Sequence, residues 1–304
     1  MAEAKRAPAP RRVSEVRRRR KIVGRLWSLL FLSVPILGVA VFVLAAGDIW
    51  PLQKHWLPVN INEHGRVIDN LFMFILYLTG AIFVGTGLVL PWFLWRYDAA
   101  ANRDPIKYSH GSHTLEVVWS ILPAATLLFI AIYQMNAWAD AKMRRPMEPG
   151  PDAVLGTEDD VKQPPLARVT GRQFEWRIQY AGPDRKLGTR DDLYGVDDLF
   201  TVNELHVPVD EEVVIQIESE DVLHSFFLPN MRIKQDVVPG MKQFVWFKAN
   251  RQGVFDIVCA ELCGWGHYKM RGRLVVESRQ DFDEWMAQEF KKQEAVLYST
   301  SVGE

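Results

Sequence analysis

The chain has 304 residues, of which 48% are hydrophobic and 24% charged, so a largely disordered or low-complexity protein is excluded. Its two cysteines exclude a disulfide-rich scaffold and a zinc ribbon with four thiolates. The formal net charge of −1 hides two unlike parts. Residues 1–139 hold 15 basic and 8 acidic residues, whereas residues 140–304 hold 21 basic and 29 acidic ones, a balance of −8. We expect no nucleic-acid partner.

The first 46 residues combine a basic stretch with an apolar one. Residues 1–25 contain ten Lys or Arg, and we expect a disordered tail there. Leu26–Ala46 contains 21 residues without a charge and suits a transmembrane helix. It also suits a cleaved secretory signal, because it ends in the small residues Ala45, Ala46 and Gly47. We favour a retained helix and leave the cleaved signal open.

Two further charge-free runs, Leu71–Trp95 and Val117–Ala139, have 25 and 23 residues. A helix rises about 1.5 Å per residue, so each run is long enough to cross a hydrocarbon core of about 30 Å. We therefore expect an integral membrane protein with a helix hairpin over 67–139, its spans at about 71–95 and 117–139. The basic tail predicts a cytoplasmic N-terminus, which places the chain beyond residue 140 outside.

Beyond residue 140 the hydrophobic period changes to two. Trp176, Ile178 and Tyr180 alternate with polar residues, as in a half-buried strand. This pattern predicts an all-β antiparallel sandwich over 140–292, with a short helix at 281–292 and a tail at 293–304. The other β-rich runs are 213–217, 244–247, 254–258 and 273–276.

The segment CAELCGWGHYKM, residues 259–270, holds the densest cluster of metal-binding side chains. It contains Cys259, Cys263, His267 and Met270, and His224 follows the predicted strand at 213–217. Thiolate, imidazole and thioether form a soft set that suits copper rather than calcium, magnesium or manganese. A mononuclear blue-copper site uses one thiolate, so two thiolates favour a bridged pair of copper ions.

This pattern resembles the binuclear copper site, CuA, of cytochrome c oxidase subunit II, and the resemblance extends over roughly residues 67–290. It implies a cupredoxin-like sandwich after the membrane helices. It also implies that Cys259 and Cys263 are bridging thiolates and that His224 and His267 are terminal imidazoles. The two weak ligands would be Met270 and the backbone carbonyl of Glu261.

The same resemblance implies a role in respiration. A cytochrome c-type donor would reduce the copper pair, and haem in subunit I would receive the electron for reduction of oxygen to water with proton pumping. The Glu261 carboxylate would reach a magnesium or manganese ion shared with subunit I, and Glu116 would lie at the mouth of the proton path called the K-channel. The chain would act only within a complex with subunits I and III, in a bacterial inner membrane with its copper domain on the periplasmic side.

One segment departs from the family pattern. GRQFEW (171–176) has Phe174 where the family has the tryptophan that receives electrons from cytochrome c. We expect Phe174 or Trp176 to be the electron-input residue, and the departure leaves the identity of the donor open. Three acidic residues match family positions and predict a docking surface for a basic donor. They are Glu220, Asp221 and Asp236.

An internal repeat lies outside this pattern: GPDAVLGTEDD (150–160) recurs as GPDRKLGTRDD (182–192). Its carboxylates are hard oxygen ligands around glycine turns, which suits calcium, although a pair of ordinary acidic turns explains the repeat equally simply. The candidate ligands are Asp152, Asp159, Asp160, Asp184, Asp191 and Asp192.

Three other functions fit part of the sequence. The chain fits the electron-input subunit of a nitric or nitrous oxide reductase, which uses the same copper chemistry. A non-redox scaffold like that of a quinol oxidase fits the fold but leaves the ligand set without a role. A Sco-like copper chaperone also uses Cys-x3-Cys with a histidine, but on an α/β fold that the β-rich pattern disfavours.

Overall fold

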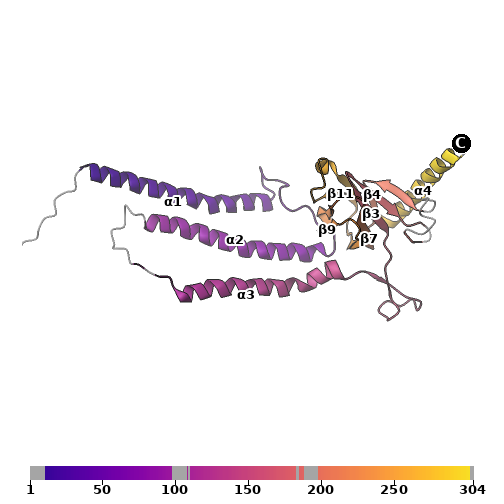
Figure 1. The fold of residues 1–304 in the computed structure, drawn as a ribbon, viewed down its shortest axis with the longest axis horizontal. Helices are drawn as coiled ribbons and strands as arrows, with labels where there is room; N and C mark the ends of the chain where they lie inside the picture. Colours follow the sequence, from indigo (N-terminus) through magenta and orange to yellow (C-terminus); the bar gives the residue numbers. More distant parts are fainter. Residues whose placement is uncertain (1–10, 98–107, 109, 183–184, 188–197, 302–304) are drawn as a thin grey trace, which may run out of the picture. The chain divides into compact units, whose positions relative to one another are not determined.

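The computed structural model describes residues 11–97, 108, 110–182, 185–187 and 198–301 (Figure 1). The chain divides into two compact units. The first comprises Met1–Leu57 and Leu71–Leu127, and the second comprises Pro58–Asn70 and Leu128–Glu304.

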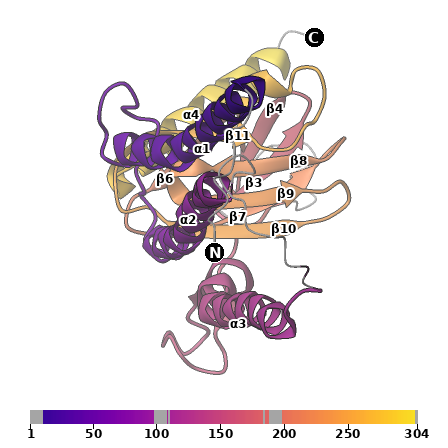
Figure 2. The same ribbon diagram turned by 90° about the vertical axis from the view of Figure 1, so that its left-hand side faces the viewer.

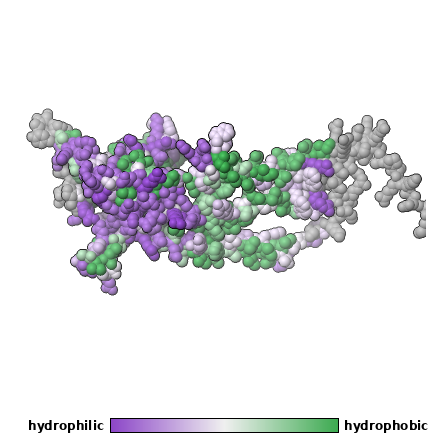
Figure 3. Space-filling model, turned by 180° about the vertical axis from the view of Figure 1, so that it is seen from behind, coloured by the Kyte–Doolittle hydropathy of each residue, from purple (hydrophilic) through white to green (hydrophobic). Residues whose placement is uncertain are grey.

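Three long helices contain the charge-free runs: α1 (Arg11–Ala46), α2 (Gly65–Arg96) and α3 (His113–Trp138). Helix α3 continues into a π-helical turn, η1 (Ala139–Met143). All three helices are long and apolar enough to cross a membrane. Figure 3 shows hydrophobic residues along these helices and mainly hydrophilic ones over the β-strands. The expected apolar helices are therefore present.

The disordered tail expected at residues 1–25 is wrong for its second part. Helix α1 begins at Arg11, so residues 11–25 are helical, whereas residues 1–10 lie outside the described residues. Arginine and lysine have high helix propensity, and an existing apolar helix extends into them without a new nucleation step.

Helix α1 packs against α2. The Ser28 hydroxyl donates a hydrogen bond of 2.7 Å to the carbonyl of Pro91. The backbones approach closely where Gly87 faces Pro35, because a Cβ at Gly87 would lie 3.0 Å from that ring. Small residues and polar bonds of this kind hold helices together in lipid. Whether α1 is retained or cleaved remains a prediction.

The second unit is a β-sandwich of two five-stranded sheets (Figures 1 and 2). The first sheet has the order β10 (Gln243–Lys248), β7 (Glu212–Ser219), β3 (Ala167–Arg172), β4 (Glu175–Tyr180), β5 (Leu199–Val202). The second has the order β6 (Glu204–Pro208), β12 (Arg271–Glu277), β11 (Gly253–Cys259), β8 (His224–Leu228), β9 (Ile233–Val237). A separate pair, β1 (Met147–Glu148) and β2 (Val161–Lys162), flanks the first acidic repeat.

The apolar residues that alternate with polar ones in the sequence of β4 are the residues buried in the core. Trp176, Ile178 and Tyr180 on β4 are all fully buried, and residues between them are only partly buried. The predicted sandwich is confirmed, but it is not purely antiparallel, because β3 pairs with β7 and β6 pairs with β12 in parallel. Parallel neighbours are far apart in the chain, so strand patterns alone do not reveal them.

The segment 58–70, which precedes the body of α2, belongs to the sandwich. Ile61 is fully buried, and its N–H donates to the carbonyl of Asn230 at 2.9 Å. Asn62 donates to the carbonyl of Met231 at 2.9 Å. The guanidinium of Arg232 contacts both carboxylate oxygens of Asp69, at 2.6 and 3.1 Å. The 58–70 segment thus supplies part of the core of a domain that begins seventy residues further along the chain.

Replacing Asp69 with alanine should loosen this attachment. The Arg232 side chain is only 10% exposed, so its charge would lose its bidentate partner in a poorly solvated place. We expect a loss of about 1–3 kcal/mol, or about 3–10 °C in melting temperature. Differential scanning calorimetry of the full chain in detergent measures it. The exposed Glu63, which pairs with Lys248, provides the control: E63A should change the melting temperature by about 1 °C or less. Equal shifts for both variants would contradict the argument.

The C-terminal helix α4 (Arg279–Ser301) lies against the sandwich (Figure 2). Trp285 stacks on the ring of His206 at 3.8 Å between centroids, and Phe282 is buried beside it. Both ring nitrogens of His206 contact carboxylates, those of Glu277 and Glu204, at 2.8 and 3.1 Å. The helix runs well past residue 292, so the tail expected at 293–304 is wrong for its helical part. Its second half has its own anchor, because Gln293 bonds the backbone of the β5 region.

Candidate metal centre

The strand pairing of β11 with β8 brings the two halves of the predicted cluster together. Cys259 is the last residue of β11 and lies opposite Phe226 of β8, two residues after His224. The loop from 259 to 270 then returns, and its ends meet where the Cys259 N–H donates to the carbonyl of Met270 at 3.2 Å. The cluster is therefore built on a strand end and a closed loop, which restricts its movement.

All six expected ligand groups meet at this loop. The two thiol sulfurs lie 3.9 Å apart, and both cysteines are free. The Nδ1 atom of His224 lies 3.9 Å from the sulfur of Cys259, and Nδ1 of His267 lies 3.6 Å from that of Cys263. Two weaker donors complete the group. The Met270 sulfur is 3.8 Å from Cys263, and the Glu261 carbonyl is 3.2 Å from Cys259.

These distances suit a shared metal. A metal–thiolate bond is about 2.3 Å long in zinc sites, so two thiolates on one ion lie at most about 4.6 Å apart. An imidazole nitrogen, bound at about 2.0 Å, lies at most about 4.3 Å from a thiolate on the same ion. The ligand atoms of His224, Cys259 and Cys263 all lie within 4.8 Å of one another. Among the described residues, this is the one group of three histidine, cysteine or acidic side chains with that closeness.

The cluster lies in a mostly buried environment. His224 is fully buried, and Cys259, Cys263 and Met270 are at most 9% exposed. Burial and the adjacent charge of Cys259 raise the pKa of the Cys263 thiol to about 12. Burial also works to raise the pKa of Cys259, but hydrogen bonds led by that of His224 prevail and lower it to about 6. The two thiols thus differ, and Cys259 gives up its proton more readily than Cys263.

A carboxylate orients the buried imidazole. Asp221 accepts a hydrogen bond from Nε2 of His224 at 2.8 Å, which leaves Nδ1 directed at the sulfur of Cys259. The other oxygen of Asp221 accepts the N–H of Gln173 at 2.8 Å. Burial works to raise the pKa of Asp221, but these hydrogen bonds hold it below its usual value. Burial likewise works to lower the pKa of His224, and its bonds to Cys259 and Asp221 raise it overall. Such outer hydrogen bonds fix the tautomer and orientation of a ligand.

The turn between β3 and β4 supports the loop from outside. The Gln173 amide donates to the carbonyl of Cys263 at 2.5 Å. The Phe174 ring lies on two loop glycines, where a Cβ would lie 3.2 Å from it at Gly264 and 2.5 Å at Gly266. Gly264 also has a φ of +138°, which L side chains rarely adopt. Gly264 and Gly266 are therefore required because the Phe174 ring leaves no room for a side chain at either position.

Replacing Gly266 with alanine should displace the loop. The new methyl group would overlap the Phe174 ring, and one of the two must move. We expect an altered absorption spectrum of the metal-loaded protein and a melting temperature lower by about 3–10 °C. Adding F174A removes the obstructing ring and should restore most of the spectrum. A normal spectrum for G266A alone would contradict this account.

The two expected electron-input residues differ in accessibility. Phe174 is half-buried, and its ring contacts the exposed Trp265 edge to face, with 5.2 Å between centroids. Trp176 is fully buried, with its ring 6.0 Å from that of His224. Trp176 therefore offers no surface to a donor, because the alternation that made it a strand residue also directs it into the core, and its role in electron input remains a prediction. Sequence reasoning did not single out Trp265, although its place between Cys263 and His267 was a signal.

The three acids expected to dock a donor have separate surroundings. Glu220 is exposed and lies 3.4 Å from Arg177. Asp236 is an exposed residue of β9 that accepts the hydroxyl of Ser225 at 2.8 Å. Asp221 holds His224, a supporting role that the sequence pattern did not reveal. Docking by these residues remains a prediction.

The remaining predicted residues lie apart from the cluster. Glu116 is in the first turn of α3, and its role in proton uptake remains a prediction. In the first repeat the carboxylates accept local hydrogen bonds: Asp159 from the Asp152 N–H and Asp160 from the Gly156 N–H. These bonds explain an acidic turn without calcium. Calcium binding by the repeat remains a prediction. In the second repeat Asp184, Asp191 and Asp192 lie outside the described residues.

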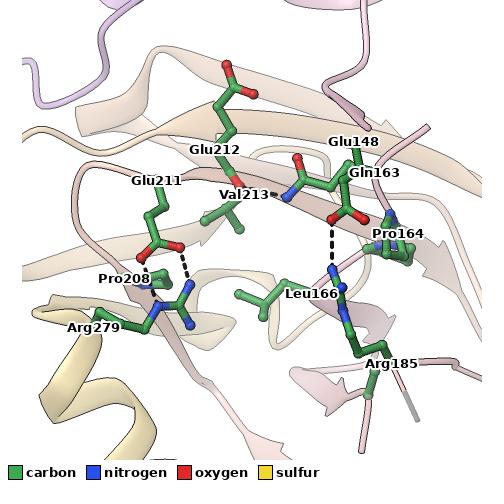
Figure 4. Close-up of a pocket in the computed structure, with 12 residues that line it drawn as sticks. Glu148, Gln163, Pro164, Leu166, Arg185, Pro208, Glu211, Glu212, Val213 and Arg279 are labelled. Carbon is green, nitrogen blue, oxygen red and sulfur yellow. Dashed lines mark hydrogen bonds and ion pairs between the residues drawn. The ribbon is translucent and has the colours of Figure 1, made fainter. Parts of the chain in front are cut away.

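A separate pocket in the β-domain has a volume of about 340 Å³, and Figure 4 shows residues that line it. Four of its charged residues form two ion pairs: Arg279 contacts Glu211, and Arg185 contacts Glu148 at 2.7 Å. Its lining residues include no histidine, cysteine or methionine, the side chains that make up the cluster.

Comparisons with known proteins agree with this architecture. The periplasmic domain model of cytochrome c oxidase subunit II matches residues 168–278, and its transmembrane domain model matches residues 61–137. An alternative cytochrome c oxidase subunit 2 from Bradyrhizobium diazoefficiens is 39% identical over 250 residues, covering 77% of this chain and 83% of the relative. A cytochrome c oxidase subunit 2 from Thermostichus vulcanus is 27% identical, covering 82% and 85%.

A crystal structure of the periplasmic domain of cytochrome oxidase subunit II from Bradyrhizobium japonicum has 34% identity, covers 41% of this chain and 93% of that one, and gives a TM-score of 0.34.

The fold and the sequence matches define a membrane-anchored subunit with a periplasmic β-domain. The chain belongs to the cytochrome c oxidase subunit II family. The resemblance drawn from the sequence is confirmed. The chain is thus a subunit of a haem-copper oxidoreductase, with subunit I as its partner.

Proposed function

We propose that this chain receives electrons for the oxidase through a binuclear copper centre in the 259–270 loop. The arrangement of soft donors supports this most directly: two free thiols 3.9 Å apart, each with one imidazole and one weak donor at its outer side. The copper ions would be held by the thiolates of Cys259 and Cys263, the imidazoles of His224 and His267, the Met270 thioether and the Glu261 carbonyl. Bound copper supplies one-electron chemistry.

The residues of the chain do the rest. Asp221 holds His224 in the tautomer that presents Nδ1, and the closed loop restricts the movement of the thiols and His267. A fixed geometry lowers the reorganisation that each electron transfer requires. Burial of the cluster keeps water from the thiols. One electron at a time would pass from a cytochrome c-type donor, by way of this site, to haem in subunit I.

The wider assignment follows from the family. Subunit I would reduce oxygen to water with proton pumping, with Glu116 at the mouth of a proton path and the Glu261 carboxylate at a shared magnesium or manganese ion. We place the complex in a bacterial inner membrane, with a retained α1 and the copper domain in the periplasm, and with subunit III as a further partner.

A metal count with an EPR spectrum tests the copper centre. The full chain, purified in detergent and loaded with copper, should bind two copper ions and give a mixed-valence signal with hyperfine splitting from both nuclei. A single copper with an ordinary cupric spectrum, or a preference for zinc, would overturn the proposal. Oxygen uptake by the purified complex, compared with nitric and nitrous oxide reduction, then separates the oxidase from the reductase alternative.

A further inference from the structure

Trp265 is the most exposed large hydrophobic residue among those described in the β-sandwich, with 80% of its surface accessible. It lies in the middle of the metal-binding loop, two residues after Cys263 and two before His267. An indole is among the costliest side chains to leave in water. Tryptophan is also enriched among the few residues that dominate protein–protein binding energy. Such exposure, next to a redox centre, indicates a surface that a partner covers.

Contacts connect the exposed ring to the buried cluster. Trp265 meets Phe174 edge to face at 5.2 Å, and Phe174 in turn lies on Gly264 and Gly266, which flank Trp265 in the loop. Phe174 is half-buried beneath, and Trp176 is fully buried, so neither offers the outermost aromatic surface. Trp265 therefore has both the exposure to touch a partner and a short path, through its own backbone, to two of the metal-binding side chains.

Charge indicates the kind of partner. Residues 140–304 carry a balance of −8, and acidic side chains lie beside the turn that holds Phe174, since Asp221 accepts the Gln173 N–H and Glu220 follows β7. Cations also lie nearby: Arg177 is 3.4 Å from Glu220, and the Lys269 ammonium is 5.9 Å from the centre of the Trp265 ring. A positively charged partner complements the overall field of this domain.

We propose, on the basis of the function proposed above, that Trp265 is the residue through which a small, net positively charged redox protein contacts this chain and delivers its electron. The partner places the exposed edge of its cofactor against the indole. The partner loses one electron and the metal pair gains one. No bond is made or broken, and no proton is required.

Binding and electron transfer can be measured separately. The purified oxidase complex is compared as wild type, W265L and W265F, with F200L as the control, because Phe200 is a half-exposed aromatic residue on β5 outside the loop. Binding is measured by surface plasmon resonance with a basic c-type cytochrome whose haem iron is replaced by zinc. Transfer is measured after flash photoreduction with a saturating amount of the native cytochrome.

We expect W265L to weaken binding by about tenfold or more, as for loss of a central interface tryptophan. The transfer rate at saturation should fall by a similar factor, W265F should lie between, and F200L should stay within about twofold of wild type. The EPR signal of the copper centre should be unchanged in every variant. Unchanged binding and transfer in W265L would overturn the inference. A wild-type complex without copper would instead refute the proposed centre, while the zinc-cytochrome binding still decides the contact.

Discussion

Replacing Cys263 or Cys259 with serine should abolish the mixed-valence signal of the copper-loaded chain. Both thiols point into one buried space 3.9 Å apart, and each is expected to bridge two ions, so loss of either breaks the whole centre. A serine hydroxyl keeps the side-chain shape but is a hard, protonated donor that copper binds poorly at neutral pH. We expect at most one copper per chain, as an ordinary cupric species. Metal analysis with EPR is the measurement.

Folding of these variants serves as the internal control. Each replacement exchanges one sulfur for a smaller oxygen and changes the core little, so the metal-free serine variants should melt within a few degrees of the metal-free wild type. Two coppers and an unchanged signal in either variant would mean that the thiols do not form the bridge. A matched M270L variant, which removes only a weak ligand, should retain both coppers with a changed spectrum.

Replacing Asp221 with alanine should weaken copper binding by about 10–100-fold, the usual effect of removing a partner that orients a metal ligand. The variant leaves Nε2 of His224 without its acceptor in a fully buried place, and frees the Gln173 N–H as well. The imidazole then has no fixed tautomer. Copper affinity is measured by competition with a chelator of known strength. The neighbouring exposed acid gives the control, since E220Q should leave affinity within about twofold. Equal affinity in D221A and wild type would contradict the supporting role of Asp221.

The parts of the fold that follow local periodicity were predictable. The alternation through Trp176, Ile178 and Tyr180 predicted a strand and its buried face, and the charge-free runs predicted the long helices. The ends of the helices were not predictable from the sequence. Arg11–Arg25, for example, has a composition that suits either a solvated tail or the extension of an existing helix. The C-terminal helix extends beyond 292 for a similar reason: a tertiary contact at Gln293 anchors it, and no local pattern shows that contact.

The candidate site was predictable as a set of ligands but not as a structure. Residue types and spacing within 259–270 were enough to predict a soft, two-thiolate cluster. The distant His224 was a further candidate because it follows a predicted strand of the sandwich. The supporting roles of Asp221 and Gln173 depend on a turn from the other sheet, which spacing does not place. The exposure of Trp265 depends on the shape of the loop, so only the structure distinguished it from the buried Trp176.

The burial of Ile61 in the sandwich has a consequence for how the chain is made. The ribosome makes the 58–70 segment before most of the α2–α3 hairpin. The β-strands on which this segment packs are made only after the hairpin. The segment must therefore remain without its partner until the hairpin has inserted and the β-domain has been exported to the same side. An odd number of membrane crossings between the 58–70 segment and the β-domain would place them on opposite sides, and the domain could not complete its core. Correct insertion of the hairpin is therefore a precondition for maturation of the periplasmic domain.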